Sequence, residues 1–114
     1  MANPSGRKGS SWEKECADYL GEVFPGVERR VKSGRYDRGD IAGLPNVTIE
    51  CKAERAIDLP GYLGELDVEQ GHTGDTFGFV FIKNRRHSVG DGYAVMSIER
   101  ARTLLCLLRD KGML

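Results

Sequence analysis

The sequence predicts an α/β protein in which one mixed sheet is flanked by helices, with elements in the order α-β-β-β-α-β-β-α. Apolar residues recur at helical spacing near both ends of the chain, which predicts two outer helices. Between them, short runs rich in Val, Ile and Phe alternate with turn-forming residues, as strands do. A chain of 114 residues holds one such domain, which buries roughly 65% of its unfolded surface.

Helix and turn signals define the first four elements. A polar segment, residues 1–9, is expected to be a flexible arm, so that the folded domain spans 10–114. Ser10 or Ser11 can cap the first helix, which Pro25-Gly26 stops. The next three segments have strand character, and the Pro45-Asn46 turn joins the second and third strands as a hairpin. These elements are expected at residues 10–24, 27–33, 40–44 and 47–52.

The remaining four elements complete the sheet and its helical cover. Pro60 suits the first turn of a helix, although Gly61 and Gly64 lower its helix propensity. A run of Phe, Val and Ile residues then predicts a buried strand. Gly112 closes the terminal helix. These elements are expected at residues 59–71, 77–83, 93–97 and 98–110.

Composition excludes several classes of protein. Hydrophobic residues make up 39% of the chain and charged residues 30%, as in soluble globular proteins. The longest run without a polar side chain, Phe77–Ile82, is too short to span a bilayer. The chain starts without the apolar segment of a secretory signal. Because Cys16, Cys51 and Cys106 are scattered and odd in number, they indicate a reducing compartment, and we expect a cytoplasmic location.

Charge is segregated along a chain whose net charge is zero. Residues 29–38 contain five bases and one acid, whereas residues 54–75 contain six acids and one base. Such segregation can create a basic face that contacts phosphate groups. The alternative, which charge alone leaves open, is a pair of solvated loops.

The first predicted helix carries an acid on its apolar face. At ~100° per residue, Glu13 falls within the arc of apolar residues that begins at Trp12. A carboxylate on a buried face is costly unless it is paired or binds a metal. The alternative is that Glu13 forms a capping box with Ser10, three residues earlier.

The main chemical signal is Asp40 followed by Glu50-Cys51-Lys52. Alternate residues of a strand share a face, so Glu50 and Lys52 point to one side and Cys51 to the other. If the hairpin forms, Asp40 lies near Glu50, and two adjacent carboxylates repel unless a cation lies between them. Carboxylate oxygens suit Mg²⁺, and a lysine beside them can stabilise a phosphoryl transition state. The alternative is a solvent-facing strand of alternating charges.

These residues resemble the signature of the PD-(D/E)XK nucleases, with Gly39 where many members carry proline. The segment from Lys8 to Glu13 resembles the opening of the archaeal-type Holliday junction resolvases. Ser33-Gly34 resembles the Ser-Gly segment of the same family. The resemblance covers residues 8–52 and beyond them extends only to the topology.

The resemblance implies a restriction-endonuclease-like fold and a Mg²⁺-dependent DNA endonuclease, with Mn²⁺ as a substitute. It assigns metal ligation to Glu13, Asp40 and Glu50, and transition-state stabilisation to Lys52. The family acts as a homodimer that makes paired, symmetric nicks in four-way DNA junctions. Gln70 is a further candidate, because many nucleases of the superfamily carry Gln or Lys at the end of this helix. Expected DNA contacts are Lys8, Arg29, Arg30, Lys32, Ser33 and Arg35.

The terminal helix is a candidate dimer interface. Its apolar residues cover about half of the circumference, more than one packing seam needs. The alternative is a helix buried on two sides within one chain. Two other functions also stay open: a restriction- or repair-type nuclease that cuts flaps or duplexes, and a non-catalytic DNA-binding module. Whichever function applies, we expect the protein in the cytoplasm. It would lie at the nucleoid or, if it is a phage protein, in the cytoplasm of the host.

Overall fold

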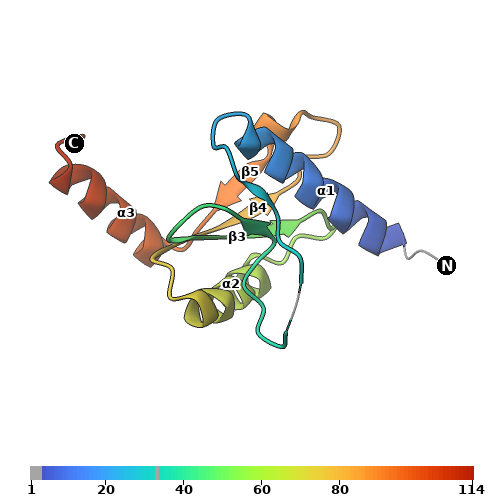
Figure 1. The fold of residues 1–114 in the computed structure, drawn as a ribbon, viewed down its shortest axis with the longest axis horizontal. Helices are drawn as coiled ribbons and strands as arrows, with labels where there is room; N and C mark the ends of the chain where they lie inside the picture. The colour runs from blue at the N-terminus through green and yellow to red at the C-terminus, as the bar shows by residue number, and fades with distance from the viewer. Residues whose placement is uncertain (1–3, 33) are drawn as a thin grey trace.

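The computed structural model of the chain describes residues 4–32 and 34–114, with side chains from residue 9 onward. In this part of the chain, α1 and α2 flank a central mixed sheet of strand order β3-β4-β5, α3 follows at its end, and β1 and β2 form a separate antiparallel pair (Figure 1). The elements are α1 (Pro4–Gly21), β1 (Glu28–Arg29), β2 (Ile41–Ala42), β3 (Val47–Lys52), α2 (Leu59–Thr73), β4 (Phe77–Ile82), β5 (Tyr93–Val95) and α3 (Ile98–Asp110).

The α/β class, the mixed sheet and the order of the elements agree with the prediction from sequence. β3 runs parallel to β4, and β4 runs antiparallel to β5. A parallel pair needs a crossover connection, and α2 supplies it. The one unpredicted helical segment in the described chain is a 3₁₀ turn, Val89–Asp91, in the loop between β4 and β5.

The first helix begins six residues earlier than the sequence predicts. Residues 4–9, assigned above to a flexible arm, belong to α1, and residues 1–3 lie outside the described chain. Pro4 fits the first turn, because its fixed φ is helical and its missing N–H has no partner there in any helix. Once the packed part of α1 has formed, each added residue needs no new nucleus, so the helix extends toward this proline.

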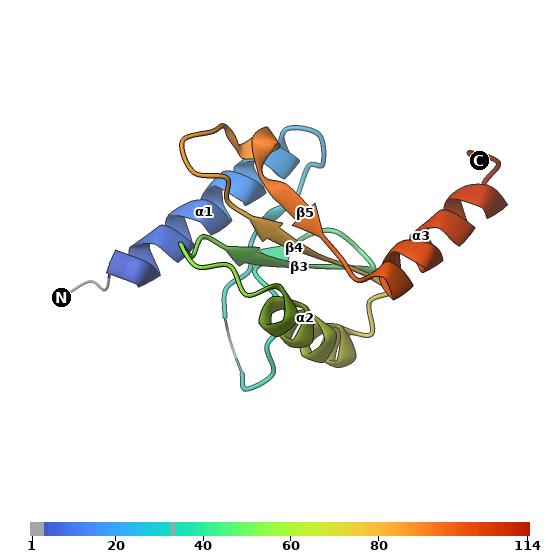
Figure 2. The ribbon, with the colours of Figure 1, turned by 180° about the vertical axis from the view of Figure 1, so that it is seen from behind.

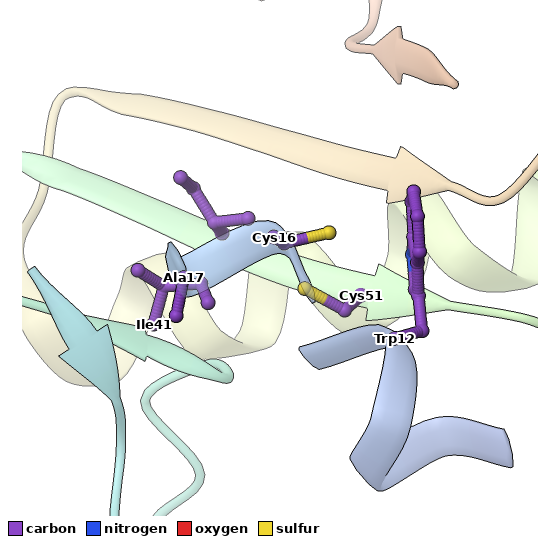
Figure 3. Packing of buried hydrophobic residues seen from close by; sticks show 6 residues of the cluster. Trp12, Cys16, Ala17, Ile41 and Cys51 are labelled. Carbon is purple, nitrogen blue, oxygen red and sulfur yellow. The ribbon is translucent and has the colours of Figure 1, made fainter. Parts of the chain in front are cut away.

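α1 and α2 cover opposite faces of the sheet (Figures 1 and 2). On the α1 side, Ile49 and Cys51 of β3 pack against Trp12 and Cys16, and Figure 3 shows this contact with both thiols between the helix and the strand. The indole Nε1 of Trp12 also donates to the Phe81 carbonyl of β4 at 2.9 Å. The three cysteines of the chain are free. This cluster therefore joins α1 to the two parallel strands.

The α2 side has its own apolar cluster. Tyr62 and Leu66 of α2 pack on Val80 and Ile82 of β4, and all four are buried. Val80 pairs in register with Glu50, so the Glu50 side chain lies on the α2 side of β3. The Asp58 side chain accepts from the Gly61 N–H at 3.1 Å and caps the start of the helix. The crossover helix is thus fixed on β4, on the face of the sheet to which Glu50 points.

The predicted hairpin between residues 40–44 and 47–52 is wrong as a pairing of two strands. β2 pairs with β1, in the register Arg29↔Ile41, rather than with β3. Two bonds nonetheless join Asp40 to β3: its N–H donates to the Ile49 carbonyl at 2.8 Å, and its Oδ2 accepts from the Cys51 N–H at 2.8 Å. A carboxylate therefore takes the place of a backbone carbonyl along the edge of β3.

α3 projects away from the rest of the fold (Figures 1 and 2). No residue of this fully described helix is buried, and Ile98 and Leu105 are among its exposed apolar side chains. Arg100 lies 3.7 Å from Asp67 and links its first turn to α2. The predicted bounds of the helix are confirmed, whereas burial on two sides within one chain is not. Like α1 and α2, α3 does not combine the length and hydropathy that a membrane-spanning helix requires.

The close approach between the α1–β1 loop and the end of β2 yields a stability prediction. Gly43 has φ 100°, and an added Cβ would overlap the Gly26 carbonyl. Gly43→Ala should therefore lower the free energy of unfolding by at least about 2 kcal/mol, measured by urea denaturation. Gly64→Ala is the matched control: its Cβ meets no atom within 4 Å in α2, so it should stabilise by about 0.5–1 kcal/mol. Equal effects of the two substitutions would contradict this account.

Candidate active site

The residues predicted to be catalytic line one hollow beside the edge of the sheet. It has a volume of about 450 Å³. Its walls come from α1, the loop before β2, and β3, which is an edge strand of the sheet. The structure therefore brings together side chains that are up to 39 positions apart in the sequence (13 to 52). Those that carry charge at the centre are Glu13, Lys32, Asp40, Glu50 and Lys52.

Asp40 is held in place by the backbone of β3. The residue is 1% exposed, and its Oδ2 accepts from the Cys51 N–H. Lys32 Nζ lies 3.3 Å from Oδ1, an ion pair without hydrogen-bond geometry. Among the described residues, Oδ1 thus has no hydrogen-bond donor, and a cation that binds it would have to displace Lys32 from the ion pair.

Gly39 explains the departure from the family pattern at the position before Asp40. Its φ is 89°, a conformation that proline cannot adopt. A Cβ at this position would lie 2.8 Å from the Ile49 carbonyl. The close approach of the backbone to β3 therefore requires glycine in this chain.

Glu50 is a buried acid among other acids. It is 6% exposed, its Oε1 lies 3.8 Å from Lys52 Nζ, and its Oε2 has no hydrogen-bond partner in the described chain. Burial and the neighbouring carboxyl groups of Glu69 and Asp40 raise the pKa of Glu50 from 4.5 to about 11. Glu50 therefore keeps its proton at neutral pH unless a cation compensates its charge.

Two further carboxylates gather around Glu50 that the sequence analysis did not single out. Oxygens of Asp37, Glu50 and Glu69 all lie within 4.8 Å of one another. Glu69 of α2 is 2% exposed, and its Oε2 has no partner among the described residues. Burial raises its pKa, as does the charge of Asp37. The signal was present in the sequence: Glu69 follows Leu66 and Tyr62 by three and seven positions, which places it on the buried helix face.

The donor set fits a hard divalent cation. Buried oxygens of Asp40, Glu50 and Glu69 lack hydrogen-bond partners in the described chain, and such oxygens are costly unless they are protonated or bound to a cation. Carboxylate oxygens are the ligands that Mg²⁺ prefers. Of the three ligands predicted from sequence, Glu50 belongs to the close acidic cluster, and Asp40 and Glu13 line the hollow beside it.

Glu13 faces the hollow from α1, as the helical periodicity predicts. Its side chain is 13% exposed and accepts from Arg29 at 3.1 and 3.2 Å. Burial and the charge of Asp40 raise its pKa, although Arg29 opposes this. The capping-box alternative is wrong, because α1 begins at Pro4 and Ser10 lies inside the helix.

Lys52 lies on the same face of β3 as Glu50, toward α2. Its Nζ is 2.7 Å from Glu65 Oε2 and 5.1 Å from the centre of the Tyr62 ring. Burial lowers the pKa of Lys52, but the bond to Glu65 and the charge of Glu50 outweigh it, so the net shift is upward. Lys52 is therefore a fixed positive charge at neutral pH, suited to stabilise negative charge rather than to remove a proton.

Of the expected DNA contacts, some pair with acids of the site and others do not. Arg29 pairs with Glu13 and Lys32 with Asp40, so both are engaged by site carboxylates. The guanidinium of Arg30 donates to the Ile41 carbonyl at 3.4 Å, whereas Arg35 is exposed. The Lys8 side chain and Ser33 lie outside the described residues.

Gln70 does not reach the hollow. It is 3% exposed, and its amide donates to the Asp75 and Thr76 carbonyls at 3.1 and 3.4 Å. Its side chain also lies against Gly78 of β4, where a Cβ would collide with it. Gln70 therefore fastens the end of α2 to the start of β4, and the neighbouring Glu69 takes the place beside the site.

Comparisons of the chain with protein-family models, with curated proteins and with solved structures give no match. The functional interpretation therefore depends on the chemistry of the hollow: buried acids without donors, a fixed lysine and bases at the rim. Such a set of side chains can bind a divalent cation and a negatively charged ligand together.

The raised pKa of Glu50 predicts a pH-dependent stability. Between its ordinary value of 4.5 and about 11, the folded state holds a proton that the unfolded chain has lost. In the absence of divalent cations, the free energy of unfolding should therefore fall from about pH 5 to about pH 8, by up to ~1.4 kcal/mol per pH unit. Melting temperatures in EDTA measure this slope. Glu50→Gln should flatten it, whereas the exposed control Asp67→Asn should leave it unchanged.

Magnesium ion should act in the opposite direction. At about pH 8, Mg²⁺ should raise the melting temperature of the wild-type protein, because it binds the folded state only. The same addition should have little effect on Glu50→Gln. A wild-type melting temperature that does not respond to Mg²⁺ would contradict the assignment of a cation site.

Proposed function

We propose that this protein is a Mg²⁺-dependent, structure-selective DNA endonuclease with the PD-(D/E)XK arrangement of its site, acting on four-way junctions as a resolvase. The observation that carries the proposal is the meeting of Asp40, Glu50 and Lys52 in one open hollow, with buried carboxylate oxygens that lack hydrogen-bond donors. The sequence resemblance names the same three residues, and the geometry supports it independently.

Each side chain has a role that its position supports. Asp40 and Glu50 would hold Mg²⁺, or Mn²⁺ in its place, with Glu69, Asp37 and Glu13 around them. When bound, the ion would polarise the scissile phosphate and lower the pKa of a water molecule. Lys52, charged and anchored by Glu65, is suited to stabilise the additional negative charge of the transition state.

A non-catalytic DNA-binding module is a poorer fit to these side chains. A binding surface gains affinity from bases that neutralise phosphates, and buried acids next to the backbone would oppose this. Here three acids that line the hollow, Asp40, Glu50 and Glu13, are largely buried, and so is Glu69 beside Glu50. Their desolvation is a cost that cation binding and catalysis explain and DNA binding alone does not.

Resolution of a junction needs two active sites in antiparallel relation, and a two-fold dimer provides them. α3 is the candidate interface. It presents exposed apolar residues along its length, and a shallow hollow lined by Ile98, Ala101 and Leu105 runs along one side. Stable interfaces have an apolar core, which this helix supplies on a surface that the same chain leaves exposed.

Substitution of the cation ligands should separate cleavage from binding. Asp40→Asn and Glu50→Gln should each abolish nicking of a labelled four-way junction in Mg²⁺, because each removes a ligand. Both should keep or improve junction binding, because each removes a negative charge that repels phosphate. Glu22→Gln, at an exposed acid just after α1, is the control and should cut at the wild-type rate. Near-wild-type cleavage by either site variant would show that the site is wrongly assigned.

The role of α3 predicts a dependence on assembly. Leu105→Glu should shift the protein from dimer to monomer in sedimentation experiments and replace paired nicks by single nicks. Thr103→Glu, at an exposed position elsewhere on the same helix, is the matched control and should stay dimeric. In mixed dimers, wild-type chains paired with Glu50→Gln chains should nick one strand and leave junctions unresolved. A wild-type monomer with full activity at micromolar concentration would favour a single-site flap or repair nuclease instead.

A further inference from the structure

A second hollow adjoins the acidic cluster and has different chemistry. It lies along the loop of residues 34–39 and the end of the β1 segment, and its volume is about 460 Å³. This is within the roughly 300–1,000 Å³ typical of sites for small organic ligands. Its walls carry four bases and one aromatic ring: Arg30, Lys32, Arg35, Arg38 and Tyr36. The same hollow includes Asp37, so it shares a residue with the acidic cluster.

Tyr36 is exposed yet supported from one side. Its residue is 56% exposed, and its ring meets the His72 ring edge-on, with centroids 5.0 Å apart. His72 Nδ1 lies 2.7 Å from the Asp37 carbonyl, and since a carbonyl only accepts, Nδ1 carries the proton and donates. His72 of α2 thus fastens the loop to this helix. The same imidazole therefore orients both the Tyr36 ring and the backbone of Asp37.

Arg35 covers the Tyr36 ring. Its guanidinium carbon lies 5.4 Å from the ring centre, and its Nη2 is 3.4 Å from the Tyr36 hydroxyl. Both residues are exposed, so this contact is weak: an exposed cation–π pair changes an equilibrium by about 2- to 5-fold. Stacking of a nucleic-acid base on an aromatic ring changes it by about 5- to 150-fold. A base can therefore displace Arg35 from the ring, and the freed guanidinium can bind a phosphate.

We propose that this hollow binds one unpaired nucleotide of the DNA substrate, with its base stacked on Tyr36 and its phosphate held by Arg35 and Arg38. The inference rests on the proposed function, in that the ligand is DNA. It adds what the protein selects: a nucleotide that has left the double helix, as found at a branch point. Bases inside a duplex are stacked on their neighbours and cannot reach a side-chain ring without being extruded.

The position of the hollow explains why such a nucleotide would matter for cleavage. Asp37 contributes its carboxylate to the acidic cluster, and its neighbour Tyr36 carries the ring. A nucleotide stacked on Tyr36 is therefore placed next to the proposed cation site, on the loop that His72 of α2 holds. Contacts to duplex phosphates alone would use the bases of this hollow but would leave the exposed ring without a role.

The test is a binding comparison in the cleavage-defective Glu50→Gln background, without divalent cations. Two duplexes are compared, identical except that one 2-aminopurine is unpaired in the first and paired in the second. The protein should bind the first duplex more tightly and quench its 2-aminopurine fluorescence. Adding Tyr36→Ala should weaken that binding by about 5- to 150-fold and abolish the quenching. Tyr36→Phe should retain both, because stacking needs the ring and not the hydroxyl.

The matched control is Tyr93→Ala, which removes another exposed tyrosine, on β5. It should change neither affinity nor quenching, and circular dichroism verifies that each variant is folded. Equal affinity of the protein for both duplexes, or a Tyr36→Ala variant that binds like wild type, would overturn the nucleotide site and leave the nuclease proposal standing. Failure to bind any duplex or junction at low salt would overturn both.

Discussion

The hydrogen bond from the Cys51 N–H to the Asp40 carboxylate is the contact on which the rest of the site depends. It makes a side chain complete the edge of β3, so the loop before β2 is tied to the sheet where a backbone ladder would otherwise run. The same residue also bonds the Ile49 carbonyl through its N–H. Asp40 is thereby fixed beside Glu50, and the basic segment before it is carried to the hollow.

Fixing Asp40 there sets up an electrostatic conflict that the fold resolves by pairing. Lys32 pairs with Asp40, and Arg29 pairs with Glu13. Glu50 keeps its proton because its pKa is raised, which removes its repulsion with Glu69. A cation bound by these oxygens would compete with Lys32 and Arg29 for the same carboxylates. In the proposed function, cation binding and the release of both bases toward phosphate would therefore be thermodynamically linked, and each would favour the other.

The sequence was sufficient for what depends on local periodicity and insufficient for what depends on distant contacts. Strand periodicity predicted that Glu50 and Lys52 share a face, and helical periodicity predicted that Glu13 lies on the buried face of α1. The structure agrees with both. Glu69 obeys the same helical rule but was hidden, because α2 contains Gly61 and Gly64 and buries two polar residues, so its apolar stripe is weak. Asp37 was not predictable, since its place is set by His72, 35 residues away.

The zero net charge of the chain also takes on a structural meaning. The acidic segment includes α2, and His72 of this helix holds the loop of the basic segment through the Asp37 carbonyl. The bases Arg29 and Lys32 pair with Glu13 and Asp40, which lie outside the acidic segment. The carboxylates of Asp40, Glu50 and Glu69 are buried, whereas Arg35 and Arg38 are exposed around the second hollow. A phosphate that approaches the loop of residues 34–39 would therefore meet positive charge first. The total charge cancels, while the exposed bases and the buried acids occupy separate places on the molecule.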